Sequence, residues 1–296
     1  MRLLVILLAW VLRRQFDARN ALDPDQWQRQ LLSRAPGEHG RRWGILPWVV
    51  AFYALAVLVV ALVSWGMQGI AWGLLASLFA LVLMLGATGM PGWREPLRAY
   101  GEAWQRGDMQ SAWHHVQHLL PAERRGASLS PELLHLNLAE SLINATFERY
   151  FLPIFWYAVL GPAGLVLILV ALAVRNHYPS VPVRERFQQW VDLLAWIPAQ
   201  LMSFSFGIAG DLSGWLNEQK RENRRPGEQR RAWLLRAASG ALSSFALDPR
   251  QFEHYHPEAW SDYGHRSLLA VRDLLNRCML VWIALLAVLA IMGMLP

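Results

Sequence analysis

The stretch FERYFLPIFWYAVLGPAGLVLILVALAVR, residues 147–175, decides how the rest of the chain is interpreted. It carries no charge between Arg149 and Arg175, and this gap is long enough for the roughly 20 residues that cross about 30 Å of hydrocarbon. We therefore predict a membrane span. A plain anchor would not open on the charged pair Glu148 and Arg149 or contain a proline and a Gly-Pro-Ala-Gly cluster. These features raise the question of whether the span also forms part of a site.

The composition of the whole chain also points to a bilayer. Of its 296 residues 54% are hydrophobic and 17% charged, with a mean hydropathy of +0.21, which is more apolar than a soluble domain of this length requires. Further uncharged segments lie between Arg42 and Arg94, long enough for two spans, and after Arg277. The predicted fold class is all-α: a polytopic helical membrane protein with about 4 to 6 membrane helices and helical cytoplasmic loops.

Arginine placement predicts the orientation. Residues 13–42 are rich in arginine and are predicted to be cytoplasmic, and a hairpin of two spans returns the chain to that side near Arg94. Residues 94–149 then form a cytoplasmic helical segment, and residues 211–277 a cytoplasmic loop. If residues 147–175 cross as one span, Arg175 lies outside. The chain, residues 1–296, is predicted to be a single integral membrane domain.

Two segments leave alternatives open. Residues 1–12 are short for a span and are interpreted as a short, tilted or partly inserted helix without a cleaved signal peptide. Residues 193–210 contain a proline and several polar side chains, so they form either a packed fifth crossing or a helix that lies against the others. Only the first alternative keeps both large loops on the arginine-rich side if residues 147–175 cross.

Charge and cysteine content limit the classes of partner. The net charge is +6, but the basic residues flank spans in loops that also carry acids, which indicates attraction to anionic lipid and not to nucleic acid. Sixteen Trp residues include several near span ends, as in an interfacial belt; for Trp104, Trp113 and Trp233 packing inside a loop is the better interpretation. The single cysteine, Cys278, excludes an internal disulfide.

No common catalytic signature is present, neither a phosphate-binding loop nor a nucleophile elbow, a zinc helix or a dinucleotide fingerprint. His114 and His118 lie one helical turn apart and could share a metal, but His on the solvated side of an amphipathic helix is commoner. His254 and His256 are two residues apart and do not share a helix face. We predict no catalytic residue, no metal ligand and no cofactor.

Two helix starts are marked by capping residues. Asp108 is the predicted N-cap of a helix in residues 109–120, and Ser130 caps a second helix with Pro131 in its first turn. No strong helix stop follows Pro131 before Phe147, so the second helix is expected to run directly into the membrane span.

Polar side chains recur along this second helix at spacings of three, four and four, at Asn137, Glu140, Asn144 and Glu148; we call this set the polar stripe. Ionisable groups at the edge of a span are costly and by default indicate a functional site. The alternative is that Glu148 pairs with Arg149 or reaches the headgroups. The predicted ligand-binding residues are Glu140, Asn144, Glu148, Arg149, Asp192, Trp196 and Gln200.

Three runs of the sequence resemble the AmpE family of bacterial inner-membrane proteins: ERYFLPIFWYAVLGPAG (148–164), LLAWIPAQL (193–201) and AWQRGDMQSAWHHVQHLL (103–120). That resemblance implies a multi-pass protein of the bacterial inner membrane that modulates a signal in β-lactamase induction and cell-wall recycling. It leaves catalysis open but favours a protein that is not an enzyme. The implied partners are membrane lipids and a muropeptide-like ligand or another protein.

The chain is also similar, more distantly, to the CobD/CbiB membrane proteins of cobalamin biosynthesis. Two of their motifs match residues of this chain. The first maps onto Glu140, Ser141, Glu148, Pro153, Phe155, Gly161 and Gly164, and the second onto Asp192, Leu193, Leu194, Trp196, Ile197, Pro198, Ala199 and Leu201. This likeness implies, as the alternative function, an ATP-dependent amide ligase or transferase on an unknown substrate, with ATP and Mg as cofactors. A polar segment of that family is replaced here by LVLILVALAVRN (165–176), and its second Glu by Asn144, which disfavours amide ligation of a corrinoid.

Overall fold

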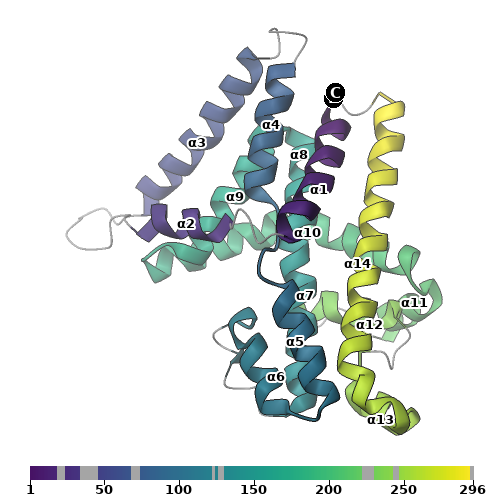
Figure 1. The fold of residues 1–296 in the computed structure, drawn as a ribbon. Helices are drawn as coiled ribbons and strands as arrows, with labels where there is room; N and C mark the ends of the chain where they lie inside the picture. Colours follow the sequence, from purple (N-terminus) through teal and green to yellow (C-terminus); the bar gives the residue numbers. More distant parts are fainter. Residues whose placement is uncertain are drawn as a thin grey trace. The chain divides into compact units, whose positions relative to one another are not determined.

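The computed structural model describes residues 1–18, 24–33, 46–67, 74–121, 124–125, 130–221, 230–242 and 247–293. Every regular element in these ranges is a helix, which confirms the predicted all-α class (Figure 1). The chain divides into two compact units. Unit 1 comprises residues 1–91, 148–198 and 285–296, and unit 2 comprises residues 92–147 and 199–284. Both segments predicted as separate cytoplasmic loops thus contribute most of their residues to one unit.

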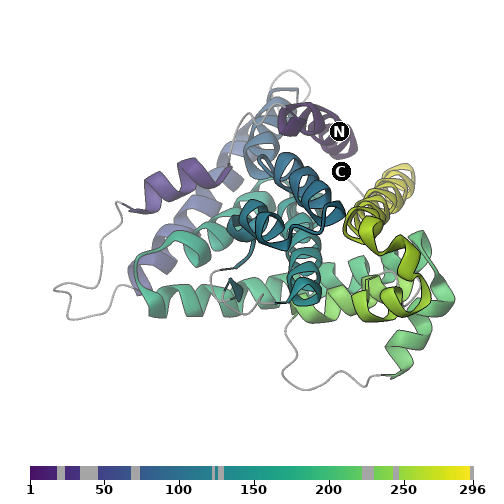
Figure 2. The same ribbon diagram turned by 60° about the horizontal axis from the view of Figure 1, so that its bottom comes forward.

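Unit 1 contains the most apolar helices, α3 (Leu46–Gly66), α4 (Leu74–Ala87) and α8 (Leu152–Leu160). Its other helices are α1 (Arg2–Ala18), α2 (Pro24–Ser33), α9 (Pro162–His177), the first part of α10 (Val181–Ala209) and the end of α14 (Trp260–Ile291). α4 packs against α1, and α9 packs against both α3 and α8 (Figures 1 and 2). Trp48 and Trp65 are exposed near the two ends of α3, where an interfacial belt places indoles.

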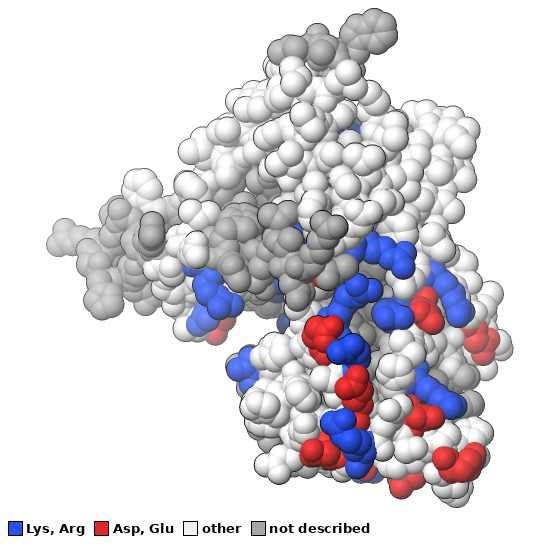
Figure 3. Space-filling view, viewed as in Figure 1, with Lys and Arg blue, Asp and Glu red and all other residues white. Residues whose placement is uncertain are grey.

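Three helical segments are long and apolar enough to cross a bilayer: α3, α10 and Pro257–Ile291, which includes most of α14. α4 and α9 are shorter apolar helices. In Figure 3 the region of α3 and α4 shows almost no charged side chains, whereas unit 2 shows interleaved basic and acidic side chains. The chain is thus an all-α membrane protein.

The prediction that residues 147–175 form one continuous span is wrong. The segment consists of a π-helical turn at Phe147–Phe151 (η4), then α8, then α9, which turns back and packs against α8. The break falls at Gly161, whose φ of +67° is a conformation that side chains other than glycine rarely adopt, and Pro162 begins the next helix. We call this segment, residues 148–177, the α8–α9 hairpin.

Local chemistry explains the π turn and the close packing of the two arms of the hairpin. Pro153 lacks the N–H that would bond the carbonyl of Arg149, so the helix widens into the π turn just before α8. A Cβ atom on Gly164 would overlap the carbonyl oxygen of Trp156 and lie 2.7 Å from Leu160 Cβ. The lack of a side chain at Gly164 therefore allows α9 to pack closely against α8.

Unit 2 is built on α7 (Pro131–Thr146), which is packed by α6 (Met109–Val116), α12 (Arg230–Ala241) and α13 (Pro249–Tyr255). Its other elements are α5 (Arg94–Gln105), η2 (Gln117–Leu119), the second part of α10, α11 (Leu212–Arg221), η5 (Pro257–Ala259) and the first part of α14. Both predicted caps are confirmed: Asp108 accepts a hydrogen bond from the Ser111 N–H, and Ser130 from the Leu133 N–H. Trp104 is buried in this unit, as expected.

Replacing Gly164 by alanine tests the hairpin packing. The added methyl group must push α9 away from α8, and overpacking of this kind costs about 1–3 kcal/mol, so the Gly164→Ala protein should unfold at a lower temperature in detergent. Gly86→Ala in α4 is the matched control, because no atom of the described residues lies within 4 Å of its added Cβ. Equal unfolding temperatures for both variants would contradict the hairpin.

Candidate functional site

In unit 2, α7 presents three residues of the polar stripe, Asn137, Glu140 and Asn144, which we call the α7 polar face. All three are at least nine-tenths buried. Arg124 Nη1 donates to Asn137 Oδ1 at 2.9 Å and to Glu140 Oε2 at 2.8 Å. The Glu140 carboxylate is therefore paired with a cation from the segment before α7, a partner that helical spacing could not reveal.

Asn144 differs from its two neighbours on this face. Its Oδ1 atom is buried and accepts no hydrogen bond from any part of the chain that the structure describes. Leaving a buried acceptor unsatisfied costs about 1–3 kcal/mol, and such an atom in a native structure calls for an explanation, such as a bound group. Among the predicted site residues, Asn144 thus has the clearest unused binding capacity.

In unit 1, Glu148 forms a bidentate ion pair with Arg175. Arg175 Nη1 lies 2.8 Å from Glu148 Oε1, and Nη2 lies 2.7 Å from Oε2. The two side chains are only 12% and 7% exposed. We call this contact the hairpin ion pair, because it joins the start of the α8–α9 hairpin to the last turn of α9. The sequence had placed Arg175 at the far end of a span, so this partner was not predicted.

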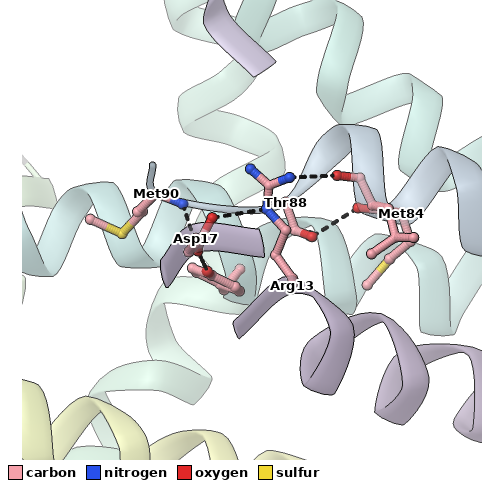
Figure 4. A network of polar contacts seen from close by, with 7 residues as sticks. Arg13, Asp17, Met84, Thr88 and Met90 are labelled. Atoms are coloured by element: carbon pink, nitrogen blue, oxygen red, sulfur yellow. Dashed lines mark hydrogen bonds and ion pairs between the residues drawn. The ribbon is translucent and has the colours of Figure 1, made fainter. Parts of the chain in front are cut away.

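A second ionic network in unit 1 was missed by the sequence reasoning. Arg13 is fully buried, and its Nε lies 3.0 Å from Asp17 Oδ1 while Nη1 donates to the Leu85 carbonyl oxygen at 3.2 Å. Asp17 Oδ2 accepts from the Met90 N–H at 3.0 Å and from the Tyr150 hydroxyl. Figure 4 shows Asp17 between Met90 and Arg13. We call Arg13, Asp17, Met90 and Tyr150 the α1 lock.

The α1 lock holds separate elements together. It connects α1, the residues just after α4 and the π turn, and its charges neutralise each other. Gly89 has a φ of +119°, and the Arg13 guanidinium occupies the space that a Cβ atom would need. The i, i+4 spacing of Arg13 and Asp17 on one apolar helix was the signal that could have indicated it.

The remaining predicted site residues have varied environments. Asp192 is exposed on α10 and accepts from Gln188 Nε2 at 2.8 Å, and Trp196 is 54% exposed. Arg149 and Gln200 are half-buried. Their role in ligand binding stays a prediction.

The buried histidine of unit 2, His135, lies in an aromatic core. Its Nδ1 atom is 3.0 Å from the Tyr100 hydroxyl, and its Nε2 atom is 2.7 Å from the Ser267 hydroxyl. Burial lowers the pKa of His135 to about 3 and raises that of Tyr100 well above its ordinary value. His135 is therefore a neutral core residue.

The other histidines considered as metal ligands are on the surface. His114, His118, His254 and His256 are exposed. Within the ranges described by the structure, no three His, Cys, Asp or Glu side chains are grouped so that they could hold a metal ion.

Fold and buried charges together define an all-α membrane protein whose described buried carboxylates are matched by arginine. The chain belongs to the AmpE family, since the family model described as regulatory signalling modulator protein AmpE matches residues 1–217. That range contains the polar stripe, the hairpin ion pair and the α1 lock.

One curated relative is the cobalamin biosynthesis protein CobD of Stutzerimonas stutzeri (strain A1501). It is 27% identical to this chain over 186 residues, which is 59% of this chain and 57% of the relative. The match thus spans little more than half of the relative's length. No solved structure matches the chain.

Breaking the hairpin ion pair should be costly. Removing one partner of a buried pair leaves an uncompensated charge and typically costs about 3–5 kcal/mol, so Glu148→Gln and Arg175→Gln should each lower the unfolding temperature markedly. The double variant should recover much of the loss because neither charge remains. Independent, additive effects in this double-mutant cycle would show that the two groups do not interact.

His135 should make the stability depend on pH. Its pKa is lowered in the folded state, so below about pH 6.5 the unfolded chain binds a proton that the folded chain does not. The free energy of unfolding then falls by about 1.4 kcal/mol per pH unit down to about pH 3. Unfolding temperatures at about pH 7.5 and 5.5 measure this loss, which His135→Gln should reduce and the exposed control His114→Gln should leave unchanged.

Proposed function

We propose that this protein is a multi-pass modulator of the bacterial inner membrane that acts in β-lactamase induction and the sensing of cell-wall recycling. Its membership of the AmpE family supports this function, and the matched range extends from α1 through α10. The uncharged helices α3 and α4 of unit 1 support a membrane location, and the mixed charges of unit 2 support a part that meets solvent and partners.

The observation that carries the ligand part of the proposal is the α7 polar face. It combines a buried carboxylate, an amide oxygen of Asn144 that accepts no described hydrogen bond, and Arg124, which is 36% exposed. A muropeptide-like ligand offers amide N–H and hydroxyl donors for Asn144 and carboxylates for the arginine. The ligand would therefore replace a missing hydrogen bond, and its binding would act on α7.

Substitutions on the α7 polar face test this proposal. Asn144→Leu removes the open acceptor, and the loss of one hydrogen bond, worth about 0.5–1.5 kcal/mol, should weaken ligand binding by up to about tenfold. Glu140→Gln removes the carboxylate that competes for Arg124, so it should strengthen the binding of a ligand carboxylate. The measurement is β-lactam-induced β-lactamase expression in the host, together with the abundance of the membrane protein.

Two further variants complete the test. Glu102→Gln, which changes an exposed carboxylate on α5, is the control, and Asp192→Asn changes the exposed carboxylate that the sequence singled out as a site residue. The proposal expects altered induction at normal abundance for the two α7 variants and none for Glu102→Gln. Unchanged induction and unchanged abundance for Glu140→Gln, Asn144→Leu and Asp192→Asn would remove the ligand proposal.

A second function is favoured by the similarity to the CobD protein, which is 27% identical over its matched part. The alternative is an ATP- and Mg-dependent amide ligase or transferase on an unknown substrate. If it applies, ATP with Mg²⁺ should raise the unfolding temperature of the purified protein, since a ligand that binds only the folded state stabilises it. No stabilisation across a panel of nucleotides would count against it.

A further inference from the structure

The lengths of α8 and α9 limit how deeply the α8–α9 hairpin can enter a membrane. From Glu148 to Leu160 the chain forms about 20 Å of helix at about 1.5 Å per residue. α9 contains 16 residues and is about 24 Å long. Both arms are shorter than the hydrocarbon core, which is about 30 Å thick. The two arms turn at Gly161, and the hairpin ion pair joins their other ends.

Other contacts within unit 1 place the two ends of the hairpin beside opposite ends of α1. The α1 lock connects Tyr150, at the start of the hairpin, to the last turns of α1 and to the residues after α4. At the opposite end of α1, Arg2 donates to the carbonyl oxygen of Ala158 near the hairpin tip. α1 therefore runs alongside α8, with its arginine-rich end at the open end of the hairpin.

This arrangement changes the expected position of the residues that follow the hairpin. Arg175 lies on the same side as Glu148, so Arg184 and Arg186 also begin α10 on that side. If α10 then crossed the membrane, the arginine-rich residues 211–277 would lie on the opposite face from residues 94–147, against the positive-inside rule. If α10 does not cross the membrane, residues 94–147 and residues 211–277 lie on the same side.

α10 has an exposed face suited to the surface of a bilayer. Large apolar side chains recur there at helical spacing and are each between 36% and 76% exposed: Leu193, Trp196, Ile197, Leu201, Phe204 and Ile208, which we call the α10 apolar stripe. The opposite side of α10 is buried, at Ala195, Ala199, Met202 and Phe206. An amphipathic helix of this kind lies in the headgroup region with its apolar face in the acyl chains.

The first turns of α10 carry a net positive charge that complements anionic headgroups, since Arg184 and Arg186 flank one acid, Glu185. At the other end of α10, Arg277 donates to the Ala209 carbonyl oxygen, next to the acid Asp211. Each arginine near an anionic membrane surface contributes about 1 kcal/mol of attraction. Together with the apolar stripe between them, these charges match a lipid surface better than a wholly apolar protein groove.

We propose that the α8–α9 hairpin is re-entrant and that α10 lies along the membrane surface on the side where the hairpin opens. The partner of the α10 apolar stripe is then anionic lipid of that leaflet. This proposal concerns the membrane contact alone and does not depend on the ligand proposed for the α7 polar face.

Cysteine labelling of the full-length protein in its host membrane tests the topology. The starting protein carries Cys278→Ser, which removes the one native thiol. Single cysteines are placed at Asn176, in the last turn of the hairpin, and at Ser213, after α10, both of which are exposed. Glu102→Cys on α5 and Met67→Cys just after α3 serve as references for the two sides.

A membrane-impermeant maleimide is then applied to intact and to permeabilised spheroplasts. The proposal expects Asn176→Cys and Ser213→Cys to react only after permeabilisation, like Glu102→Cys, while Met67→Cys reacts in intact spheroplasts. Reaction of Asn176→Cys in intact spheroplasts would show that the hairpin crosses. Reaction of Ser213→Cys alone would show that α10 crosses, and either result overturns the proposal.

A second measurement identifies the partner of the α10 apolar stripe. An environment-sensitive fluorophore is attached at Ile197→Cys or Phe204→Cys in protein reconstituted into phosphatidylglycerol-containing vesicles, with exposed Gln189→Cys as the control. A surface-lying helix gives similar quenching by spin-labelled lipid at both stripe positions and less at the control. Absence of quenching at both stripe positions would show that protein covers the stripe.

Discussion

The ion pair between Glu148 and Arg175 is the constraint on which the arrangement of unit 1 depends. Two charges that are largely withdrawn from water are tolerated only when they are close to each other and well hydrogen-bonded, and here both carboxylate oxygens meet guanidinium nitrogens. Satisfying this pair requires α9 to return to the level where the π turn begins. The chain can make that return because Gly161 adopts a positive φ and Pro162 starts a new helix.

The returning helix then determines the positions of its neighbours in unit 1. Tyr53 on α3 donates to the Leu167 carbonyl oxygen of α9 at 3.0 Å, and its ring contacts Phe187 on α10. Trp156 on α8 donates to the Leu194 carbonyl oxygen at 3.2 Å. Arg13 likewise donates to a carbonyl oxygen at the end of α4. Polar side chains in this apolar unit are therefore bonded to main-chain oxygens, as expected where water is scarce.

The sequence predicted the features that depend on local chemistry. Uncharged gaps indicated a helical membrane protein, and Asp108 and Ser130 marked helix starts because an N-cap needs only the next three residues. Helical spacing also identified the α7 polar face. The partners of its residues were not predicted, since Arg124 reaches Glu140 from outside the helix and no periodicity records that contact.

The prediction of one continuous span at residues 147–175 was wrong for a specific reason. Hydropathy counts apolar residues and treats a hairpin and a span alike, whereas the break depends on one glycine, one proline and an ion pair between residues 27 positions apart. The Gly-Pro dipeptide was visible, but its meaning depended on a distant arginine. The same limit applies to Tyr150, whose bond to Asp17 joins residues 133 positions apart.

The most direct test of this account is the distance between the two ends of the α8–α9 hairpin in the native membrane. With Cys278→Ser as background and the ion pair left in place, Arg149→Cys and Asn176→Cys are combined and treated with a short bifunctional thiol crosslinker, and the linked peptides are identified by mass spectrometry. The hairpin predicts efficient crosslinking within one chain. A continuous helix would separate the two residues by about 40 Å, so absence of the linked peptides, with both cysteines singly reactive, would contradict the account.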